Sequence, residues 1–247
     1  MGRLEDLNSL SREELFFVAR MAEQAERYEE MVEMMRAFVQ KEHTALSSNE
    51  RNLLSAAYKN LVGNRRTSWR VLNSIEQKEE RRGNSENKTR ATTYKEQVEG
   101  ELRSYCREIL RLIDSDLLPN ETSKEGRVFY LKMKGDYHRY ICEFASGDYK
   151  EQSAKEAQEC YQQAMKVAEE ELESTDPTRL GLALNFSVFF YEIMEQHEEA
   201  CNMARKAFDE AIAGLENVTD ENAYKDATLI LQLLRDNLTL WTSEQES

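Results

Sequence analysis

Proline and glycine are scarce in this chain, whose 247 residues include only 2 prolines and 9 glycines. Both residues interrupt helices, so their scarcity favours a chain built of long helices. Glu, Lys, Gln, Leu and Ala are abundant and favour the same structure, whereas Val, Ile and Thr rarely alternate with polar residues as they would in strands. We therefore predict an all-α fold of nine helices, joined by short loops and packed as an antiparallel array.

The chain also lacks the cysteine and histidine spacings of metal sites. Its cysteines are widely separated and form no Cys-x-x-Cys pair, which argues against a disulfide framework or a zinc site. They are Cys106, Cys142, Cys160 and Cys201, and we expect them to be reduced and buried. None of the 3 histidines has a glutamate three positions before it, so a helical di-iron site is not indicated.

Motifs of catalysis and nucleotide binding are missing as well. The sequence contains no His-Glu-x-x-His, no Gly-x-Gly-x-x-Gly and no Walker loop. A helical enzyme is one alternative function class, and His138 beside Arg139 is the pair that invites it, but a structural role for this ring is the simpler interpretation. We expect no catalytic residue, no metal and no cofactor.

Long apolar runs are absent. No run approaches the roughly 20 residues of a membrane span, and Met1 to Arg20 has no signal-peptide core, so the cytosol is the expected location. The 33 basic and 47 acidic residues give a net charge of −14, which disfavours nucleic acids and anionic membranes as partners. Two stretches oppose this balance, with seven basic residues against three acidic ones from Lys59 to Arg82 and four against one from Arg127 to Tyr140. Local basic patches in an acidic chain suggest an anion site.

One basic ridge lies within the stretch YKNLVGNRRTSWR. Lys59 and Arg66 are seven residues apart, which places them on one helix face two turns apart, with Gly63 between them. The glycine leaves a hollow that serves either close helix packing or ligand approach. Two converging cations suit a phosphate, although two basic residues on a helix more often form a solvated face.

A second helix repeats this arrangement. Lys132 and Arg139 are again seven residues apart, and Tyr140 adds a hydroxyl beside Arg139. If both ridges face one concave surface, their arginines offer planar bidentate forks to a phosphate. The alternative is a pair of helices held by salt bridges.

Two later helices place amide groups on otherwise apolar faces. The first face carries Asn185, Val188 and Glu192. The second has residues recurring every four positions, namely Leu229, Leu233, Asn237 and Trp241. Such faces either line a groove that grips an extended peptide backbone or pack into the core, where the amides satisfy neighbouring polar groups.

Capping patterns and breaks set the expected helix boundaries. Met31, Met34, Met35 and Phe38 are expected in the core. The predicted signals are capping boxes at Ser47–Glu50 and Thr122–Glu125, an N-cap at Asp176 before Pro177, a loop from Glu79 to Lys88 and a fourth helix from Thr92 to Leu117. No repeat of about 34 residues is visible, which weighs against a tetratricopeptide-like scaffold. Such a scaffold, which would bind unmodified chain termini, is therefore only an alternative.

Five segments of the sequence are distinctive. They are AEQAERYEEM (Ala22 to Met31), RNLLSAAYKNLVGNRRTSWRV (Arg51 to Val71), VFYLKMKGDYHRY (Val128 to Tyr140), RLGLALNFSVFFYE (Arg179 to Glu192) and YKDATLILQLLRDNLTLW (Tyr224 to Trp241). In this order they closely resemble the 14-3-3 protein family, the first resembling its dimerisation region. The likeness covers the chain from Glu14 to Trp241.

The resemblance implies a single domain over residues 1–242, a concave cup of nine antiparallel helices, and a short tail at 243–247. Residues 1–117 would supply dimer contacts and the start of a peptide groove, and residues 118–242 the rest. The implied function is that of a non-enzymatic adaptor, which binds phosphoserine or phosphothreonine segments of client proteins in an amphipathic groove. It would regulate these clients as a homodimer, or as a heterodimer with related chains, in the cytoplasm and, through clients, in the nucleus.

The resemblance also implies roles for individual residues. The phosphate-binding residues would be Lys59, Arg66, Arg139 and Tyr140. The residues that bind the peptide backbone would be Asn185, Glu192, Asn237 and Trp241. The apolar wall of the groove would be Leu184, Val188, Leu229, Ile230 and Leu233, with Lys132 at the groove edge.

In the dimerisation region, Arg27 and Glu101 resemble an intersubunit salt bridge of the family, and Tyr94 is present as well. Gln97 stands where many members have a lysine opposite Glu30, so a second pair lacks its cation. Phe190 stands where many members have Tyr.

A possible regulatory phosphosite follows two arginines. Ser68 comes directly after the sequence Arg65-Arg66-Thr67, a basic context that suits phosphorylation. The resemblance implies that charge added here would split the dimer.

Overall fold

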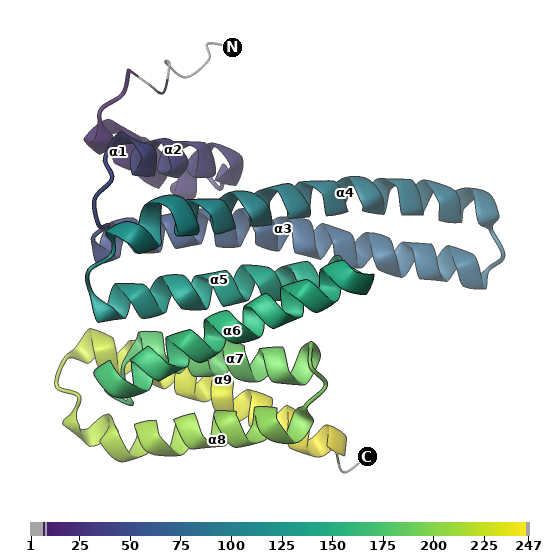
Figure 1. Cartoon of the computed structure of the whole chain (residues 1–247). Coiled ribbons are helices and arrows are strands. Elements are labelled where there is room, and N and C mark those ends of the chain that lie inside the picture. Colours follow the sequence, from purple (N-terminus) through teal and green to yellow (C-terminus); the bar gives the residue numbers. More distant parts are fainter. Residues whose placement is uncertain (1–6, 8, 246–247) are drawn as a thin grey trace. The chain divides into compact units, whose positions relative to one another are not determined.

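The computed structural model describes residue 7 and residues 9–245, with side chains described up to residue 243. Over these residues the chain forms nine α-helices and no strand, which confirms the predicted all-α class (Figure 1). The helices are α1 (Arg12–Gln24), α2 (Tyr28–Lys41), α3 (Ser48–Arg81), α4 (Ser85–Leu112), α5 (Lys124–Phe144), α6 (Gly147–Glu171), α7 (Pro177–Glu192), α8 (His197–Gly214) and α9 (Glu221–Gln245). Short π- and 3-10 segments occupy Ile113–Leu117, Leu118–Asn120 and Leu215–Asn217.

Two predicted helix starts are confirmed. Glu50 donates its backbone N–H to Ser47 Oγ at 3.3 Å, and Ser47 returns its own N–H to Glu50 Oε2 at 2.7 Å. Asp176 Oδ1 accepts from Thr178 N at 2.8 Å, directly before a helix that begins at Pro177. In both cases a side chain satisfies N–H groups that have no partner inside the helix.

Other boundary predictions are wrong. The N-cap of α5 is Ser123, whose Oγ accepts from Gly126 N at 3.0 Å, rather than Thr122. The loop predicted from Glu79 to Lys88 is much shorter, because α3 continues to Arg81 and α4 already begins at Ser85. Gly83 turns the chain with a φ of +71°, a conformation that suits glycine.

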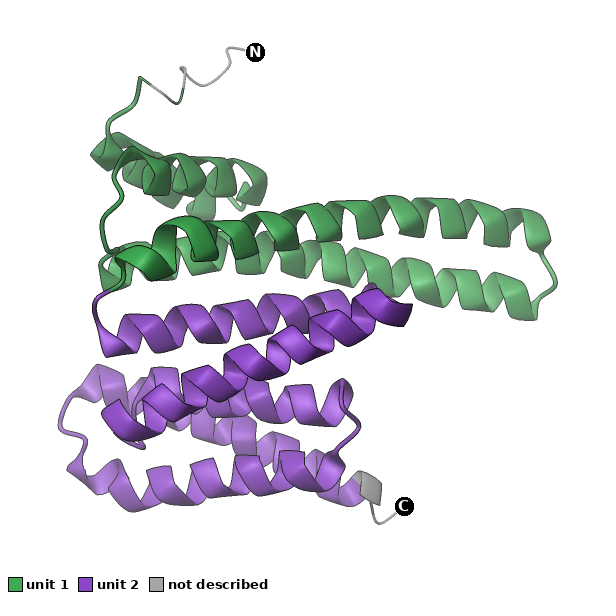
Figure 2. Ribbon diagram, in the orientation of Figure 1, with its two compact units in different colours: residues 1–121 green, residues 122–247 purple. Residues whose placement is uncertain are grey.

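The chain divides into two compact units, Met1–Glu121 and Thr122–Ser247 (Figure 2). Unit 1 contains α1 to α4 and unit 2 contains α5 to α9. The last helix extends to Gln245, so residues 243–245, expected at the start of the tail, are helical. Residues 246–247 of that predicted tail lie outside the described part of the chain.

In unit 1, the long helices α3 and α4 run side by side in opposite directions (Figure 1). Trp69 Nε1 donates to Glu99 Oε1 at 2.8 Å across this pair. The shorter α1 and α2 pack together, and the predicted core residues of α2 are confirmed as buried. They are Met31, Met34, Met35 and Phe38, each at most 1% exposed.

In unit 2, α5 and α6 pack against each other, and an aromatic cluster joins α6 to α7. The ring of Tyr161 on α6 stacks on Phe186 of α7 at a centroid distance of 5.1 Å, and Phe186 in turn stacks on Phe190 at 4.6 Å. Burying such large rings supplies much of the apolar stabilisation of this unit.

All four cysteines are buried and free, as predicted. No described helix combines the length and apolar character that crossing a membrane requires.

Candidate ligand-binding site

The first predicted basic ridge lies on α3 in unit 1. Lys59 is exposed and Arg66 is partly buried. A side chain added at Gly63 would meet no described atom within 4 Å, so close packing does not require a glycine there. Of the two interpretations of this hollow, the structure favours open surface available to a ligand.

Arg65, next to Arg66, has a different role. Its Nη2 pairs with Glu29 of α2 at 2.6 Å, and its Nε pairs with Glu101 of α4 at 3.0 Å. These hydrogen bonds raise the pKa of Arg65 against the lowering effect of burial. Arg65 therefore ties three helices of unit 1 together.

Two of the three predicted dimer residues have ion-pair partners within this chain. Arg27 pairs with Glu30, and Glu101 with Arg65. Tyr94 is 58% exposed, and on α1 the large apolar side chains of Phe17 and Met21 are 63% and 46% exposed. These apolar groups leave surface on α1 and α4 that a partner can cover.

The second predicted ridge, on α5, is organised by a buried carboxylate. Asp136 Oδ2 accepts from Lys132 Nζ at 2.8 Å, and Asp136 Oδ1 lies 3.4 Å from Arg139 Nη2. Since these residues are spaced i, i+4 and i+3 on one helix, a single carboxylate reaches both cations. Arg139 is only 6% exposed, as is Asp136, so the pair is held away from water.

Two further side chains complete this polar network. Tyr161 on α6 donates its hydroxyl to Asp136 Oδ1 at 2.6 Å and accepts from Arg139 Nε at 3.2 Å. Asn185 on α7 donates to the same carboxylate oxygen at 2.8 Å. The Asn185 amide thus has the neighbouring partner that its apolar helix requires, and three helices of unit 2 meet at Asp136.

The network shifts the pKa values of Asp136, Arg139 and Tyr161. Burial raises the pKa of Asp136, but the charges of Lys132 and Arg139 and the hydrogen bonds outweigh it, so the pKa lies below the usual value. Burial lowers the pKa of Arg139, but Tyr161, Tyr140 and Asp136 raise it well above its usual value. The pKa of the Tyr161 hydroxyl is raised well above its usual value, first by burial and then by Asp136. At neutral pH Asp136 is therefore a carboxylate, Arg139 a cation and Tyr161 a neutral phenol.

Tyr140 lies beside Arg139 as the sequence predicted. Its ring centroid is 4.8 Å from the Arg139 guanidinium carbon, and it meets the ring of Tyr137 edge-on at 5.4 Å. These contacts restrain both side chains on α5.

Asp136 and Tyr161 are the members that the sequence interpretation missed. For Asp136 a signal was available, since it is the one acidic residue among the cations between Arg127 and Tyr140. Tyr161 lies 25 residues farther along the chain and in no predicted motif, so no signal identified it.

The predicted apolar wall lies on α7 and α9 of unit 2. Leu184, Val188 and Ile230 are partly buried. Leu229 and Leu233, one turn apart on α9, are 61% and 45% exposed. Exposed leucines at this spacing form an apolar strip that does not serve the core.

The predicted polar partners on these two helices differ in exposure. Glu192 is exposed and Asn237 is partly buried. Trp241 is only 4% exposed, and its ring stacks on Tyr191 of α7 at 4.5 Å and 10°. Tyr191 stacks in turn on His197, with ring centroids 4.4 Å apart. The main visible role of Trp241 is therefore to hold α9 against α7.

Among the described residues, no group of His, Cys, Asp and Glu side chains could hold a metal ion. His138 is partly buried on α5, in keeping with a structural role.

Comparison with known proteins decides the family. The sequence model of the family described as 14-3-3 protein matches residues 18–242. The chain belongs to the 14-3-3 family. It is 53% identical over 238 residues to 14-3-3 protein beta/alpha of Bos taurus, covering 96% of this chain and 95% of the relative. It is also 55% identical over 240 residues to 14-3-3-like protein G-BOX factor 14 kappa of Arabidopsis thaliana, covering 96% of each chain.

Membership in the 14-3-3 family settles the function class. Members of this family are adaptors without enzymatic activity, and they bind phosphorylated peptides. This 14-3-3 protein is therefore a phosphopeptide-binding adaptor, and neither the helical enzyme nor the tetratricopeptide-like scaffold describes it.

Proposed function

We propose that Lys59, Arg66, Arg139 and Tyr140 bind the phosphate of a phosphoserine or phosphothreonine in client proteins. The observation that carries this proposal is the buried Arg139, held by Asp136 and Tyr161. A phosphate carries about −1.5 to −2 charges at neutral pH, so cations fixed on helices distinguish it from an unmodified hydroxyl. Because Arg139 is already ordered, little side-chain entropy remains to be lost when the phosphate binds.

The charge balance on α5 supports this role. Lys132 and Arg139 share the single carboxylate of Asp136, so the three residues keep one net positive charge. An anion that approaches Arg139 therefore meets an oriented cation in a group of residues with a net positive charge. Lys132, bound to Asp136, would act at the groove edge through its charge.

The rest of the peptide would lie along α7 and α9. We assign the peptide backbone contacts to Asn185, Glu192, Asn237 and Trp241 and the apolar wall to Leu184, Val188, Leu229, Ile230 and Leu233. The exposed strip of Leu229 and Leu233 supports the apolar part, because a client side chain gains by covering it. Asn185 keeps its carbonyl oxygen as an acceptor while its amide nitrogen donates to Asp136.

The protein would act as a dimer, either with itself or with related chains. Arg27, Tyr94 and Glu101 would lie at the interface, beside the exposed Phe17 and Met21. Two linked sites can hold a doubly phosphorylated client, and the second contact is then intramolecular, which raises avidity. We place this activity in the cytoplasm and, through clients, in the nucleus. The net charge of −14 disfavours nucleic acid or membrane as a partner.

Replacing Lys59 by glutamate tests the phosphate site. We expect Lys59→Glu to weaken binding of a phosphoserine peptide by about a hundredfold or more, because it removes a charge-assisted bond and adds repulsion. Fluorescence anisotropy with a labelled peptide measures the affinity, and circular dichroism checks the fold. The control is Lys78→Glu, the same charge change at an exposed position of the same helix. Equal affinities for the two variants would refute the assignment of Lys59.

A further inference from the structure

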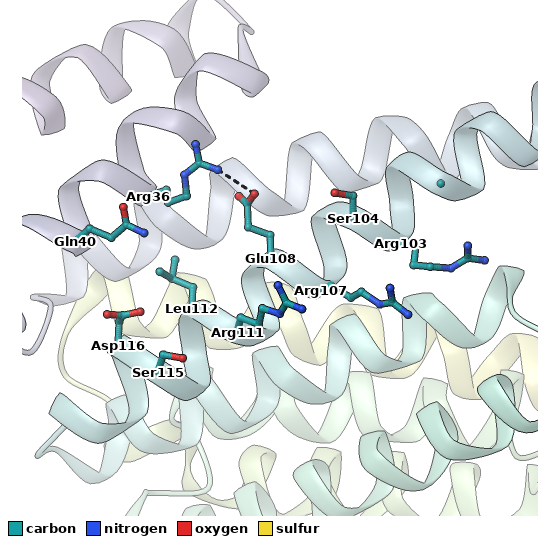
Figure 3. A pocket seen from close by; sticks show the side chains of 11 residues that line it. Arg36, Gln40, Arg103, Ser104, Arg107, Glu108, Arg111, Leu112, Ser115 and Asp116 are labelled. Atoms are coloured by element: carbon teal, nitrogen blue, oxygen red, sulfur yellow. Dashed lines mark hydrogen bonds and ion pairs between the residues drawn. The ribbon is translucent and has the colours of Figure 1, made fainter. Parts of the chain in front are cut away.

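A second concentration of positive charge lies in unit 1, away from the residues proposed to bind phosphopeptides. A pocket of about 480 Å³ is lined by Arg36 of α2 and by Arg103, Arg107 and Arg111 of α4. Figure 3 shows the three arginines of α4 following one another along the helix, with Arg36 on the neighbouring helix. None of the four residues proposed to bind the phosphate of a client lines this pocket.

The spacing on α4 explains the cluster. Arg103, Arg107 and Arg111 recur at i, i+4 and i+8, so they share one face and follow one another at about 6 Å along the helix axis. Ser104 and Ser115 of the lining add hydroxyl groups, and Gln40 adds an amide. The lining is therefore rich in hydrogen-bond donors spread over about 12 Å.

Two carboxylates line the same pocket, and both have partners. Glu108 pairs with Arg36 at 3.0 Å and accepts from the hydroxyl of Tyr58 at 2.6 Å. Asp116 lies 3.3 Å from Nδ1 of His43. Among the lining residues, four arginines outnumber two carboxylates, although the chain as a whole has a net charge of −14.

We propose that this pocket binds a small soluble molecule that carries several phosphate groups. The forked guanidinium group of arginine binds phosphate oxygens bidentately. Three arginines spread over about 12 Å of helix match several phosphate groups better than a single phosphate. The cavity volume falls in the usual range for small-molecule sites. This site goes beyond the phosphopeptide function and does not depend on it.

The composition of the lining favours a small polyphosphate over a protein segment. Leu112 is the one apolar side chain among the lining residues that the structure describes. A bound protein segment usually anchors itself through buried apolar or aromatic side chains, for which this pocket offers little surface. A compact, highly charged ligand needs no such apolar surface.

Calorimetric titration with sodium tripolyphosphate at low salt tests the proposal. We expect saturable binding that weakens as potassium chloride is added. The variant Arg107→Gln/Arg111→Gln should raise Kd by about tenfold or more, because two charge-assisted contacts are lost. Ser104→Asp, which keeps every arginine and adds a carboxylate to the lining, should also weaken binding. Both changes are at exposed positions and should leave the fold intact.

Three controls separate this pocket from other sources of anion binding. Arg81→Gln/Arg90→Gln removes the same charge from exposed positions of α3 and α4 outside the pocket, and Lys59→Glu disrupts the proposed phosphopeptide site. Arg81→Gln/Arg90→Gln should bind tripolyphosphate with unchanged affinity, and Lys59→Glu should keep the binding that Arg107→Gln/Arg111→Gln loses. No binding by the wild type, or an equal loss in the Arg81/Arg90 or Lys59 variant, would overturn the proposal. The proposal would also be overturned if a phosphate-free hexaglutamate peptide bound as tightly and its binding were lost in the Arg107→Gln/Arg111→Gln variant. The occupant would then be an acidic protein segment.

Discussion

Arg139 keeps its position on α5 because one carboxylate serves several donors at once. Asp136 accepts from Lys132, Tyr161 and Asn185 and pairs with Arg139, all within unit 2. A buried ion pair contributes little net stability compared with apolar residues of the same shape, but removing one partner leaves the other charge uncompensated. The network therefore serves to orient Arg139, and the stability of the fold around it depends on every member of the network being present.

Asp136→Asn should expose this dependence. The change keeps the shape of the side chain but leaves Lys132 and Arg139 without their carboxylate, so we expect a loss of about 3 kcal/mol in the free energy of unfolding. Urea unfolding followed by circular dichroism measures it. Asp209→Asn, at an exposed position of α8, is the matched control and should change stability by less than about 0.5 kcal/mol. Equal stability of the two variants would contradict the role of Asp136.

The lowered pKa of Asp136 fixes the pH range of this effect. Because the pKa is lower in the folded than in the unfolded chain, the contribution of Asp136 is fully present above the unfolded pKa of about 3.9 and is lost as the pH falls through the folded value. The stability difference between wild type and Asp136→Asn should therefore be constant from about pH 6 to pH 8 and shrink only in strong acid.

The site residues proposed from the sequence are those with a local pattern. Lys132, Arg139 and Tyr140 were found from helical spacing and a neighbouring position, and the structure restrains Arg139 and Tyr140 together. Asp136 is a single acidic residue among cations, a pattern that resembles ordinary surface charge. Tyr161 enters only through tertiary packing, which no spacing within α5 encodes.

At the scale of helices, the contact between α5 and α6 depends on a residue without a side chain. A Cβ atom at Gly135 would lie 2.6 Å from Cε1 of the Tyr161 ring, closer than real Cβ contacts allow. The glycine therefore lets the buried ring lie directly against the backbone of α5. It also brings the Tyr161 hydroxyl within reach of Asp136.

Gly135→Ala should separate these two helices. Although alanine favours helices, we expect a net loss of about 1–3 kcal/mol in the free energy of unfolding, because Tyr161 has no room to move within the core. Gly100→Ala on α4 is the control, since its Cβ meets no described atom within 4 Å, and it should stabilise the chain by about 0.5–1 kcal/mol. Thermal unfolding of both variants would show shifts of opposite sign; a stabilised Gly135→Ala would contradict the packing role.

The helix starts after Ser47 and Asp176 were predictable, because at each a side chain caps the backbone. The connection after α3 was not. Polar residues near Glu79 suggested a long loop, but they form the exposed end of a helix pair in which Lys88 pairs with Glu80 across the turn. Polarity alone does not separate a solvated helix from a loop, and the packing of α4 on α3 decides the matter.

In the whole molecule, Ser68 lies close in sequence to residues that hold the proposed dimer interface. Ser68 is exposed on α3 and donates its hydroxyl to the Asn64 carbonyl at 3.0 Å. It lies one turn from Arg65, which holds Glu29 and Glu101. A negative charge at Ser68 would compete for Arg65 and disturb the side chains proposed to lie at the dimer interface.

Ser68→Asp imitates that charge. We expect it to shift the protein from dimer to monomer, with a dissociation constant raised by about tenfold or more. Light scattering at several concentrations measures the mass. Asn52→Asp adds the same charge at another exposed position of α3 and should leave the dimer intact. A dimer of unchanged stability in Ser68→Asp would rule out this regulation.

As a phosphopeptide-binding adaptor, this protein should distinguish a client segment by its phosphate. The most direct test is the affinity of the wild-type protein for one peptide with and without its phosphate, measured by fluorescence anisotropy at the same salt concentration. Oriented cations such as Arg139 should raise the affinity for the phosphorylated form by about a hundredfold or more. Equal affinity for the two forms would contradict the account.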